Sequence, residues 1–178
     1  MRKLKEENAI VACLEPEKYS DFYFEYENTI VHTSSPNASR QLAEKYNIQY
    51  LNLFRSGGCI ITSPGDFAIV FVYNEEKMST ESQKFYQYII NKSLEYGITL
   101  EIDSNDLIFK KDNQTFKLAG AAEGHRRGVF YTVIHLSINV NYKLIEKVCG
   151  KKVKTPMGFN SLISKEIVEQ WIQEYERN

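Results

Sequence analysis

The chain has 178 residues, of which 43% are hydrophobic and 25% are charged, the balance of an ordinary globular domain. Its 22 Lys and Arg residues against 23 Asp and Glu residues give a formal net charge of −1, so no overall field attracts nucleic acid or a membrane surface. The composition therefore excludes a disordered chain, and the length predicts a single domain spanning residues 1–178.

Cysteine usage and apolar runs indicate the compartment. Cys13, Cys59 and Cys149 are odd in number and widely spaced, and no Cys-x-x-Cys pair or Cys/His cluster has zinc-ligand spacing. This pattern argues against a disulfide scaffold and a metal site, and it favours a reducing cytoplasm. No run approaches the roughly 18–20 apolar residues that cross a bilayer. We therefore expect a cytoplasmic protein with neither a membrane nor a nucleic acid as partner.

The first half of the chain predicts mostly short strands. Aromatic and β-branched residues over 21–31 predict one or two strands, and Ser35-Pro36 opens a helix predicted to run to residue 48. Further strands are predicted before and after a Ser-Gly-Gly turn, at 50–54, 59–61 and 67–73. The last of these is apolar on both faces, as a central strand would be.

The second half mixes helices and strands without a regular βαβ repeat. A capping box at Thr80 and Gln83 and a stop at Gly97 predict a helix over 80–96. Strands are predicted at 98–102, 107–110, 115–118 and 130–140, and helices at 142–148 and 164–175. These elements predict an α+β fold in one domain, with a mixed, largely antiparallel sheet flanked by helices.

Arg55, Ser56, Gly57 and Gly58 form a candidate anion-binding turn. Two adjacent glycines let successive backbone N–H groups converge on a ligand. The Arg55 guanidinium can add a contact to a phosphate or carboxylate. An ordinary turn between two strands is the alternative interpretation.

Two further positions place a reactive side chain beside small residues. Lys117 is followed by Gly120, Ala121 and Ala122, which leave room for a ligand beside the backbone; the alternative is a lysine that faces solvent. Cys149 would be a nucleophile if a nearby cation favoured its thiolate, and the alternative is a small buried apolar residue.

Two other polar features have structural interpretations. His135 alternates with apolar neighbours inside a predicted strand, so we expect a core residue whose polar atoms are satisfied. The basic run of Lys151, Lys152 and Lys154 is expected to be solvated surface rather than an anion site.

Together, in this order, these segments resemble the lipoate-protein ligase/octanoyltransferase family. The Arg-Ser-Gly-Gly turn, Asn105-Asp106 and Lys117-Leu118-Ala119-Gly120-Ala121-Ala122 are similar to the R-R-x-S/T-G-G-G, Asn-Asp and K-I-S-G-S-A segments of the ligases. The tail from His135-Leu136-Ser137-Ile138-Asn139-Val140 through Cys149-Gly150 to Asn160-Ser161-Leu162 is similar to the octanoyltransferases, in which a P-C-G cysteine precedes a T-S-L segment. The separation of Lys117 and Cys149, 149 − 117 = 32 residues, is close to that of the family's pair. The likeness covers residues 28–165.

The resemblance implies a biotin/lipoate protein ligase-like fold and an enzyme that joins an octanoyl or lipoyl group to a lysine of a lipoyl-domain protein. It implies catalytic roles for Lys117 and Cys149. In the ligases this lysine contacts the acyl carbonyl and phosphate of an acyl-adenylate, and in the transferases it sits beside the nucleophilic cysteine. It also implies substrate-binding roles for Arg55, Ser56, Gly57, Gly58, Asn105, Asp106, Gly120, Ala121 and Ala122.

Two routes to the amide remain open. The transferase route takes octanoyl from an acyl carrier protein through a thioester on Cys149. The ligase route uses ATP, lipoate and Mg²⁺ and needs no cysteine. No tightly bound cofactor is expected in either. The small size and Cys149 favour the transferase, whereas Ser56-Gly57-Gly58 and Asn105-Asp106 are more similar to the ligases.

Several positions depart from the family pattern. Thr62-Ser63 stands where the family has Tyr-His, Val133-Ile134 where it has His-Gly, Cys59 at the third glycine and Val148 before the tail cysteine. We also expect no C-terminal accessory domain. These departures motivate an alternative, a catalytically impaired member that acts as a binding or partner subunit. Biotin is a weaker alternative to lipoate because the G-R-G-R-x-G loop of biotin ligases is absent.

Overall fold

The computed structural model describes residues 2–4, 23–26, 30–32, 41, 43–51, 60–73, 78–126, 129–149 and 154–177. Within these residues, the larger of two sheets has the strand order β1-β2-β6-β10-β9-β8-β7, and β11 pairs with β9 off this path. Its strands are β1 (Arg2–Leu4), β2 (Tyr23–Tyr26), β6 (Phe67–Tyr73), β7 (Leu100–Asp103), β8 (Asp106–Lys111), β9 (Gln114–Arg126), β10 (Val129–Leu136) and β11 (Thr155–Pro156). The smaller sheet has the order β4-β3-β5, with β3 (Ile30–His32), β4 (Gln49–Leu51) and β5 (Ile60–Ile61).

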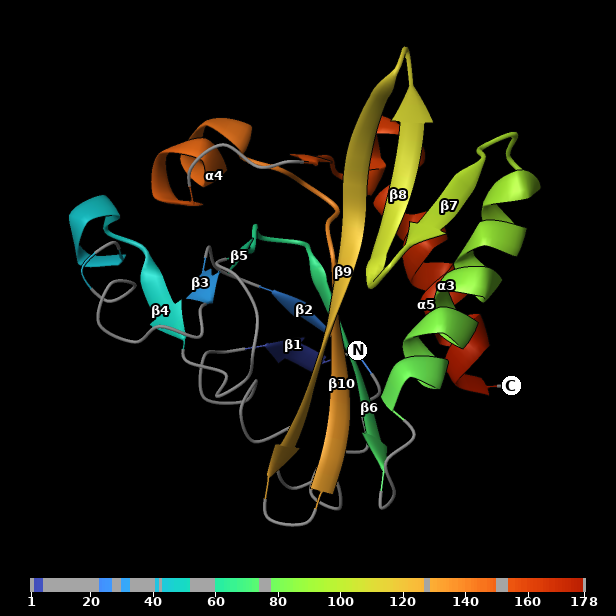
Figure 1. Cartoon of the computed structure of the whole chain (residues 1–178), viewed down its shortest axis with the longest axis horizontal. Helices are drawn as coiled ribbons and strands as arrows, with labels where there is room; N and C mark the ends of the chain where they lie inside the picture. Colours follow the sequence, from blue (N-terminus) through green and yellow to red (C-terminus); the bar gives the residue numbers. More distant parts are fainter. Residues whose placement is uncertain are drawn as a thin grey trace.

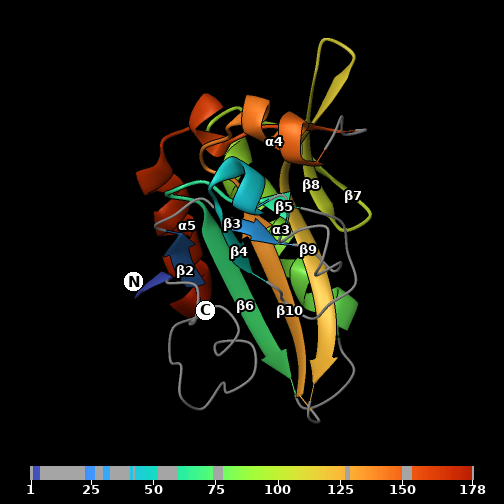
Figure 2. The same cartoon turned by 90° about the vertical axis from the view of Figure 1, so that its left-hand side faces the viewer.

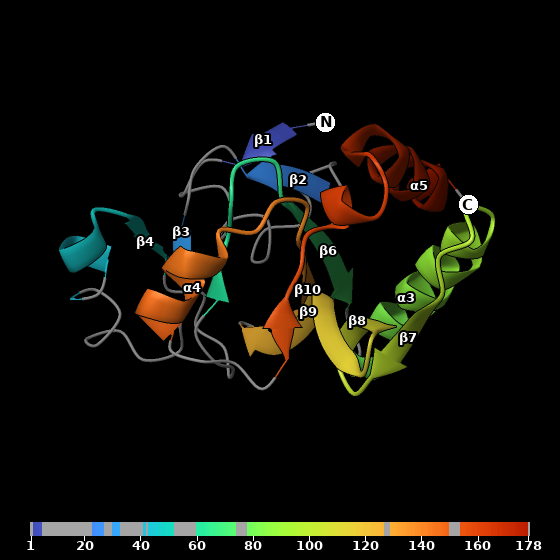
Figure 3. The same cartoon turned by 90° about the horizontal axis from the view of Figure 1, so that it is seen from above.

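Helices lie on one face of the larger sheet and the smaller sheet lies beyond the other. α3 (Met78–Leu94) and α5 (Lys165–Arg177) pack side by side on the first face, and the short 3-10 helix η2 (Phe159–Ser161) precedes α5 (Figure 1). The smaller sheet and α4 (Tyr142–Cys149) lie on the opposite side, as the view from above shows (Figure 3). In the view turned by 90°, β6, β10 and β9 run as long neighbouring strands behind the smaller sheet (Figure 2).

Most pairs in the larger sheet are antiparallel. β2 with β6, β6 with β10, β10 with β9, β9 with β8 and β8 with β7 all pair in this way. The β1–β2 and β9–β11 pairs are parallel. This mixed, largely antiparallel sheet with flanking helices confirms the predicted α+β class.

The core lies between the larger sheet and the helices α3 and α5. Strand alternation sends Phe67 and Ile69 of β6 and Ile134 and Leu136 of β10 to the helix-covered face, where all four are fully buried. The facing helices contribute Phe85, Tyr86, Ile89, Val168, Trp171 and Ile172 to the same buried cluster. The apolar core therefore occupies one face of the sheet and leaves the other face for a site.

Helix α3 begins before its predicted start and ends at Leu94, two residues before its predicted end, whereas Gly97 forms the predicted stop. It begins two residues before Thr80, so the capping box predicted at Thr80 is wrong. At the other end, the N–H of Gly97 donates to Leu94 and the N–H of Ile98 donates to Ser93, with Gly97 at a φ of 71°. These two hydrogen bonds around a glycine with positive φ form a Schellman motif, which stops the helix as the sequence predicted.

Strands β9 and β10 differ in length from their predictions. β9 continues well past Leu118, its predicted end, because β10 pairs with it from Ala119 onward. β10 stops short of residue 140, its predicted end. The reason is that the Asp66 carboxylate, rather than a neighbouring strand, accepts the N–H groups of Ile138 and Asn139.

The other predicted elements lie near their expected positions. The segment 21–31 contains β2 and the start of β3, and β4, β5, β6, α4 and α5 correspond to the segments predicted at 50–54, 59–61, 67–73, 142–148 and 164–175. Residues 41 and 43–46 are helical, within the helix predicted at 35–48. α4 closes a second apolar cluster, in which Ile145 and Val148 pack against Ala43 and Ile61.

Candidate functional site

A β-bulge in β9 places Lys117 and Gly120 on the same face of the sheet. The pairing of β8 with β9 is regular at Asp106 and Gly120 but shifts before Lys117, so Leu118 is the extra residue of the bulge. In a regular strand, residues three apart point to opposite faces. Because of the bulge, the Lys117 Nζ instead lies over Gly120, 2.6 Å from the position that a Cβ would occupy there.

The Lys117 ammonium is held above this glycine by an ion pair. Its Nζ lies 2.6 Å from Asp106 Oδ1, and the two side chains are 36% and 19% exposed. A Cβ at Gly120 would lie 2.8 Å from Lys117 Cε and 3.3 Å from Asp106 Oδ1. Any other residue at this position would therefore displace the ammonium. Since an ion pair this exposed adds little to stability, its relevance lies in fixing a cation at an accessible place.

A second ammonium, from Lys154, joins the same carboxylate. Its Nζ lies 2.8 Å from Asp106 Oδ2 and 2.9 Å from Asp103 Oδ2. Burial opposes the charge of Lys154, but hydrogen bonds to Asp106 and Asp103 outweigh it and raise the pKa of this lysine. The hydrogen bond from Lys154 lowers the pKa of Asp103. The prediction that Lys154 is solvated surface charge is wrong, because its partners come from β7 and β8, far away in the sequence.

Ser104 and Asn105 form the turn that joins β7 to β8, and Asp106 is the first residue of β8. The backbone oxygen of Asn105 accepts hydrogen bonds from the N–H of Ala121 at 2.8 Å and from the Tyr86 hydroxyl at 3.1 Å. Tyr86 is buried, and burial together with the nearby Asp106 charge raises the pKa of its hydroxyl well above 10.0, so the hydroxyl stays a donor. Helix α3 and strand β9 thus hold the turn, and the Asn105 side chain is exposed.

The small residues that follow Lys117 divide between the two faces of β9. Gly120 lies opposite His135 of β10 and Ala122 lies opposite Val133, whereas Ala121 packs against the helix-side core. By strand alternation, Gly120 and Ala122 are on the face turned away from α3 and α5. Because Gly120 and Ala122 are small, they place no bulky side chain on the sheet surface beside Lys117.

Asp66 and His135 form a second polar pair on this face. His135 Nε2 lies 3.0 Å from Asp66 Oδ2, and the Asp66 side chain is 1% exposed. The Asp66 carboxylate also accepts N–H groups from Ser63 at 2.8 Å, Ile138 at 2.7 Å and Asn139 at 3.1 Å. Four donors satisfy the buried carboxylate. His135 has a polar partner, as expected, but it lies on the face opposite the main core and is 13% exposed, so the expectation of a core position is wrong. Asp66 was not predicted, because its partner lies 69 residues away.

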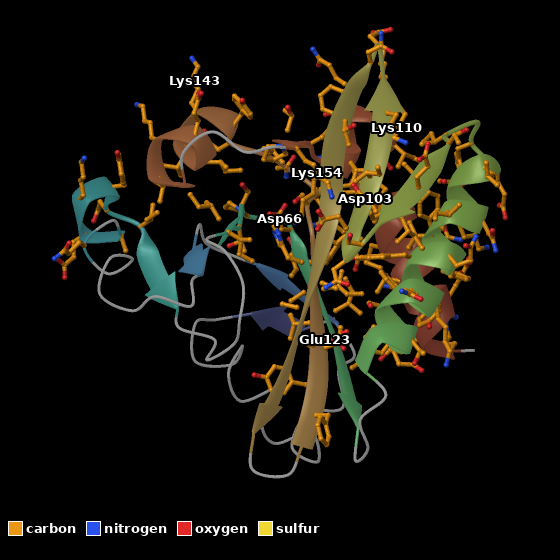
Figure 4. The ribbon with its side chains drawn as sticks, viewed as in Figure 1. Asp66, Asp103, Lys110, Glu123, Lys143 and Lys154 are labelled. Carbon is orange, nitrogen blue, oxygen red and sulfur yellow. The ribbon has the colours of Figure 1, made fainter. Side chains whose placement is uncertain are left out.

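A groove of about 880 Å³ opens beside the end of β10. Its lining combines apolar side chains with amides and hydroxyls: Ser63, Pro64, Phe116, Ile138, Asn139, Val140, Asn141, Tyr142, Lys143, Thr155, Pro156, Met157, Gly158, Asn160 and Ser161. Lys143 projects from α4 in Figure 4, which also shows Lys154 next to Asp103. The groove borders β9 at Phe116, and Pro156, which pairs with Lys117, also lines it.

Several predicted site residues lie outside what the structure describes. Arg55, Ser56, Gly57 and Gly58 fall between β4 and β5 in a segment that is not described. Cys149 is the last residue of α4, and the position of its thiol is likewise not described. The expected approach of the thiol and of the glycine turn to Lys117 therefore stays a prediction. Lys117, Asn105, Asp106 and Gly120 do come together.

The positions that depart from the family pattern are buried where the structure describes them. Thr62, Ser63 and Val133 are at most 7% exposed. Among the described residues, no three His, Cys, Asp or Glu side chains gather in a way that could hold a metal ion. No helix in the described part of the chain is long and apolar enough to cross a membrane.

Comparison with solved structures shows the same fold in lipoate ligases. The chain is similar to a bi-partite lipoate protein ligase from Thermoplasma acidophilum, with 13% identity, a TM-score of 0.66, and 97% of this chain and 75% of that chain covered. It is also similar to a lipoate-protein ligase A bound with ATP, with 14% identity, a TM-score of 0.62, and coverage of 84% and 68%. A third similar structure is P. falciparum LipL1 in complex with lipoate, with 16% identity, a TM-score of 0.62, and coverage of 87% and 48%.

The family is shown by sequence. No curated protein sequence matches the chain significantly. The family model described as the lipoyl protein ligase A/B catalytic domain matches residues 22–167, which include the bulge, the Lys117–Asp106 pair and α4. The chain therefore belongs to the lipoyl protein ligase A/B catalytic domain family.

Proposed function

We propose that this protein transfers a lipoyl-type acyl group, octanoyl or lipoyl, to a lysine of a lipoyl-domain protein, with Lys117 as the central catalytic group. The observation that carries the proposal is the Lys117 ammonium, fixed 2.6 Å from Asp106 above Gly120 in a domain of the lipoyl ligase family. An ammonium at this place can donate a hydrogen bond to an acyl carbonyl and stabilise the negative charge that develops on its oxygen during attack.

In the transferase route, Cys149 divides acyl transfer into two steps. Its thiolate attacks the carbonyl of an octanoyl thioester, the new S–C bond forms, and the carrier leaves as its thiol. The amine of the acceptor lysine then attacks the acyl-cysteine, forms the amide and releases Cys149. Lys117 would stabilise both tetrahedral intermediates and exchange a proton with the sulfur that leaves. The presence of Cys149 favours this route.

The ligase route is the alternative within the same function. The similar structures include a ligase bound with ATP and one in complex with lipoate, and another is described with its E2 lipoyl domain. In this route Lys117 would contact the carbonyl and the phosphate of an acyl-adenylate. Arg55, Ser56, Gly57 and Gly58 would bind the anion through backbone N–H groups and the guanidinium.

Intact-mass measurement distinguishes the routes. After incubation with octanoyl-carrier protein, the transferase route requires an adduct of octanoyl mass that is present in the wild type and absent in Cys149→Ser. An adduct that survives Cys149→Ser excludes this route. Formation of an amide on an apo lipoyl domain only with ATP and lipoate would establish the ligase route.

Lys117→Ala tests the catalytic assignment in either route. We expect transfer to an apo lipoyl domain to fall by about 100-fold or more, as when a group that stabilises an oxyanion is removed. Lys110→Ala is the matched control, because Lys110 lies on the neighbouring strand and pairs with Glu101 in solvent. If Lys117→Ala transfers at the wild-type rate, Lys117 is not the catalytic group.

A binding or partner subunit of the same fold is the second candidate. The buried Thr62, Ser63 and Val133, at positions where the family has polar Tyr-His and His-Gly elements, favour it. This candidate requires a lipoyl domain to bind in calorimetry while no donor gives transfer. Detectable transfer that depends on Lys117 would exclude it.

A further inference from the structure

The two carboxylates beside Lys117 could serve as ligands for a divalent cation, yet both are engaged by Lys154. Carboxylate oxygens are the protein ligands that Mg²⁺ prefers, and ATP-dependent ligation needs this ion. The Lys154 Nζ lies 2.8 Å from Asp106 Oδ2 and 2.9 Å from Asp103 Oδ2. The remaining Asp106 oxygen, Oδ1, lies 2.6 Å from Lys117 Nζ. Both oxygens of Asp106 are therefore taken by ammonium groups.

A magnesium ion does not fit this arrangement. It needs a near-octahedral shell of oxygens at about 2.0–2.1 Å. Here it would have to displace one ammonium and would then lie next to the other, with like charges a few ångströms apart. In this cluster, the two positive charges of the lysines, Lys117 and Lys154, already balance the two negative charges of the aspartates, Asp103 and Asp106.

The backbone holds Lys154 in place. β11 follows Lys154 immediately and pairs in parallel with β9, with Pro156 opposite Lys117. The N–H of Met157 donates to the Lys117 backbone oxygen at 2.9 Å. β11 occupies the edge of β9 that β10 leaves, since β10 pairs with β9 only from Ala119 onward. Lys154 is thus anchored beside Asp106 by the same strand that carries Lys117.

We propose that the Lys154 ammonium takes the place of a divalent cation at Asp103 and Asp106, so that acyl transfer at Lys117 needs no divalent metal and uses a thioester donor. This proposal rests on the proposed function. A thioester carries no charge at the reacting carbonyl, which suits a cluster whose own charges cancel. The phosphates of ATP would bring several negative charges, which this cluster, with its two ammonium groups already paired, does not neutralise. Because Lys154 reaches the reacting atoms only through Asp106, it is a positioning residue.

Binding of Mn²⁺ alone, without substrate, tests the metal exclusion. In the full chain we expect no Mn²⁺ broadening of the amide resonances of Asp103 and Asp106. Lys154→Met removes the ammonium and should allow Mn²⁺ to broaden them at least tenfold more than in the wild type. Lys154→Met combined with Asp103→Asn should abolish this binding. Lys110→Met is the matched control, since it removes a charge on β8 that forms its ion pair with Glu101 and not with Asp103 or Asp106, and it should behave as the wild type.

Two results of this titration would overturn the proposal. One is Mn²⁺ binding at these residues in the wild type that Asp106→Asn removes, because the cation site would then exist beside Lys154. The other is no binding in Lys154→Met, because Lys154 would not be what excludes the cation.

A transfer assay tests the donor. With octanoyl-carrier protein and an apo lipoyl domain, we expect less than a twofold change when EDTA is added, and a loss of tenfold or more in Lys154→Met with recovery in Lys154→Arg. A tenfold loss with EDTA, or transfer from ATP and lipoate alone, contradicts the thioester donor. If neither donor gives transfer, the proposed function fails, while the Mn²⁺ titration still decides the part played by Lys154.

Discussion

At the scale of single residues, the site depends on one extra residue in one strand. Leu118 is that residue, and it lets Lys117 and Gly120 share a face. The glycine is then required because its missing Cβ leaves the space that the lysine side chain crosses. The spacing of lysine and glycine in this segment is thus explained by the geometry of a bulge.

Gly120→Ala tests this explanation. The added methyl would lie 2.6 Å from Lys117 Nζ and must push the flexible end of that side chain aside. We expect acyl transfer to fall by tenfold or more, while the free energy of unfolding, measured by urea denaturation, changes by no more than about 1 kcal/mol.

Gly97→Ala is the control with the opposite pattern. Gly97 has nothing within 4 Å of a Cβ but a φ of 71°, so the substitution should cost about 1 kcal/mol or more of stability and leave transfer unchanged. A Gly120→Ala protein with full transfer activity would show that the ammonium does not need its present position.

The sequence was enough to predict some of these residues and not others. Lys117, Gly120, Asn105 and Asp106 were found because they fall in short segments with a recognisable order. Lys154 was missed because a lysine in a basic run looks solvated, and only the return of β11 to β9 brings it to Asp106.

At the scale of elements, Asp66 joins two parts of the chain. The carboxylate follows the β5–β6 turn and accepts the N–H groups at which β10 ends. Hydrogen bonds of this kind leave no periodic pattern in the sequence, so they could not be predicted from it. The predicted end of β10 was too late and the predicted end of β9 was too early, and the two errors have related causes. Strand propensity is high in residues 130–140 and low in the Ala-Gly-Ala-Ala segment at 119–122. The available hydrogen-bond partners, rather than propensity, determined where β10 and β9 end.

Asp66→Asn should destabilise the protein without changing its shape. The amide cannot accept all four donors as the carboxylate does, so one or more buried N–H groups lose their partner. We expect a loss of about 2–4 kcal/mol in the free energy of unfolding by chemical denaturation. Asp112→Asn, in the exposed β8–β9 turn, should change it by less than about 0.5 kcal/mol. Equal effects of the two substitutions would contradict the structural role of Asp66.

The contact between α3 and α5 should make stability depend on pH. The hydrogen bond from Lys92, with a further one from Gln170, lowers the pKa of Glu174 from 4.5 to about 2. Since the folded state depresses this pKa, the contribution of Glu174 is complete above pH 4.5 and is lost as the pH falls towards 2. The difference in unfolding free energy between the wild type and Glu174→Gln should therefore shrink over that range. A difference that is the same at pH 7 and pH 2 would exclude the ion pair as its cause.

At the scale of the whole molecule, the sheet separates two tasks. One face carries the apolar core with α3 and α5, and the smaller sheet and α4 lie on the side of the other face (Figure 1). By strand alternation Lys117 is on this other face, where it pairs with Asp106, which also pairs with Lys154. The α+β class and the largely antiparallel sheet followed from the hydrophobic pattern and the lack of βαβ alternation. The strand order did not, because β6 pairs with β10 across more than fifty intervening residues.

A crystal structure with bound octanoate or lipoate tests the central claim most directly. If Lys117 acts on the acyl group, one carboxylate oxygen of the ligand should lie within about 3.2 Å of Lys117 Nζ, above Gly120. A ligand bound on another surface, with Lys117 still paired only to Asp106, would contradict it.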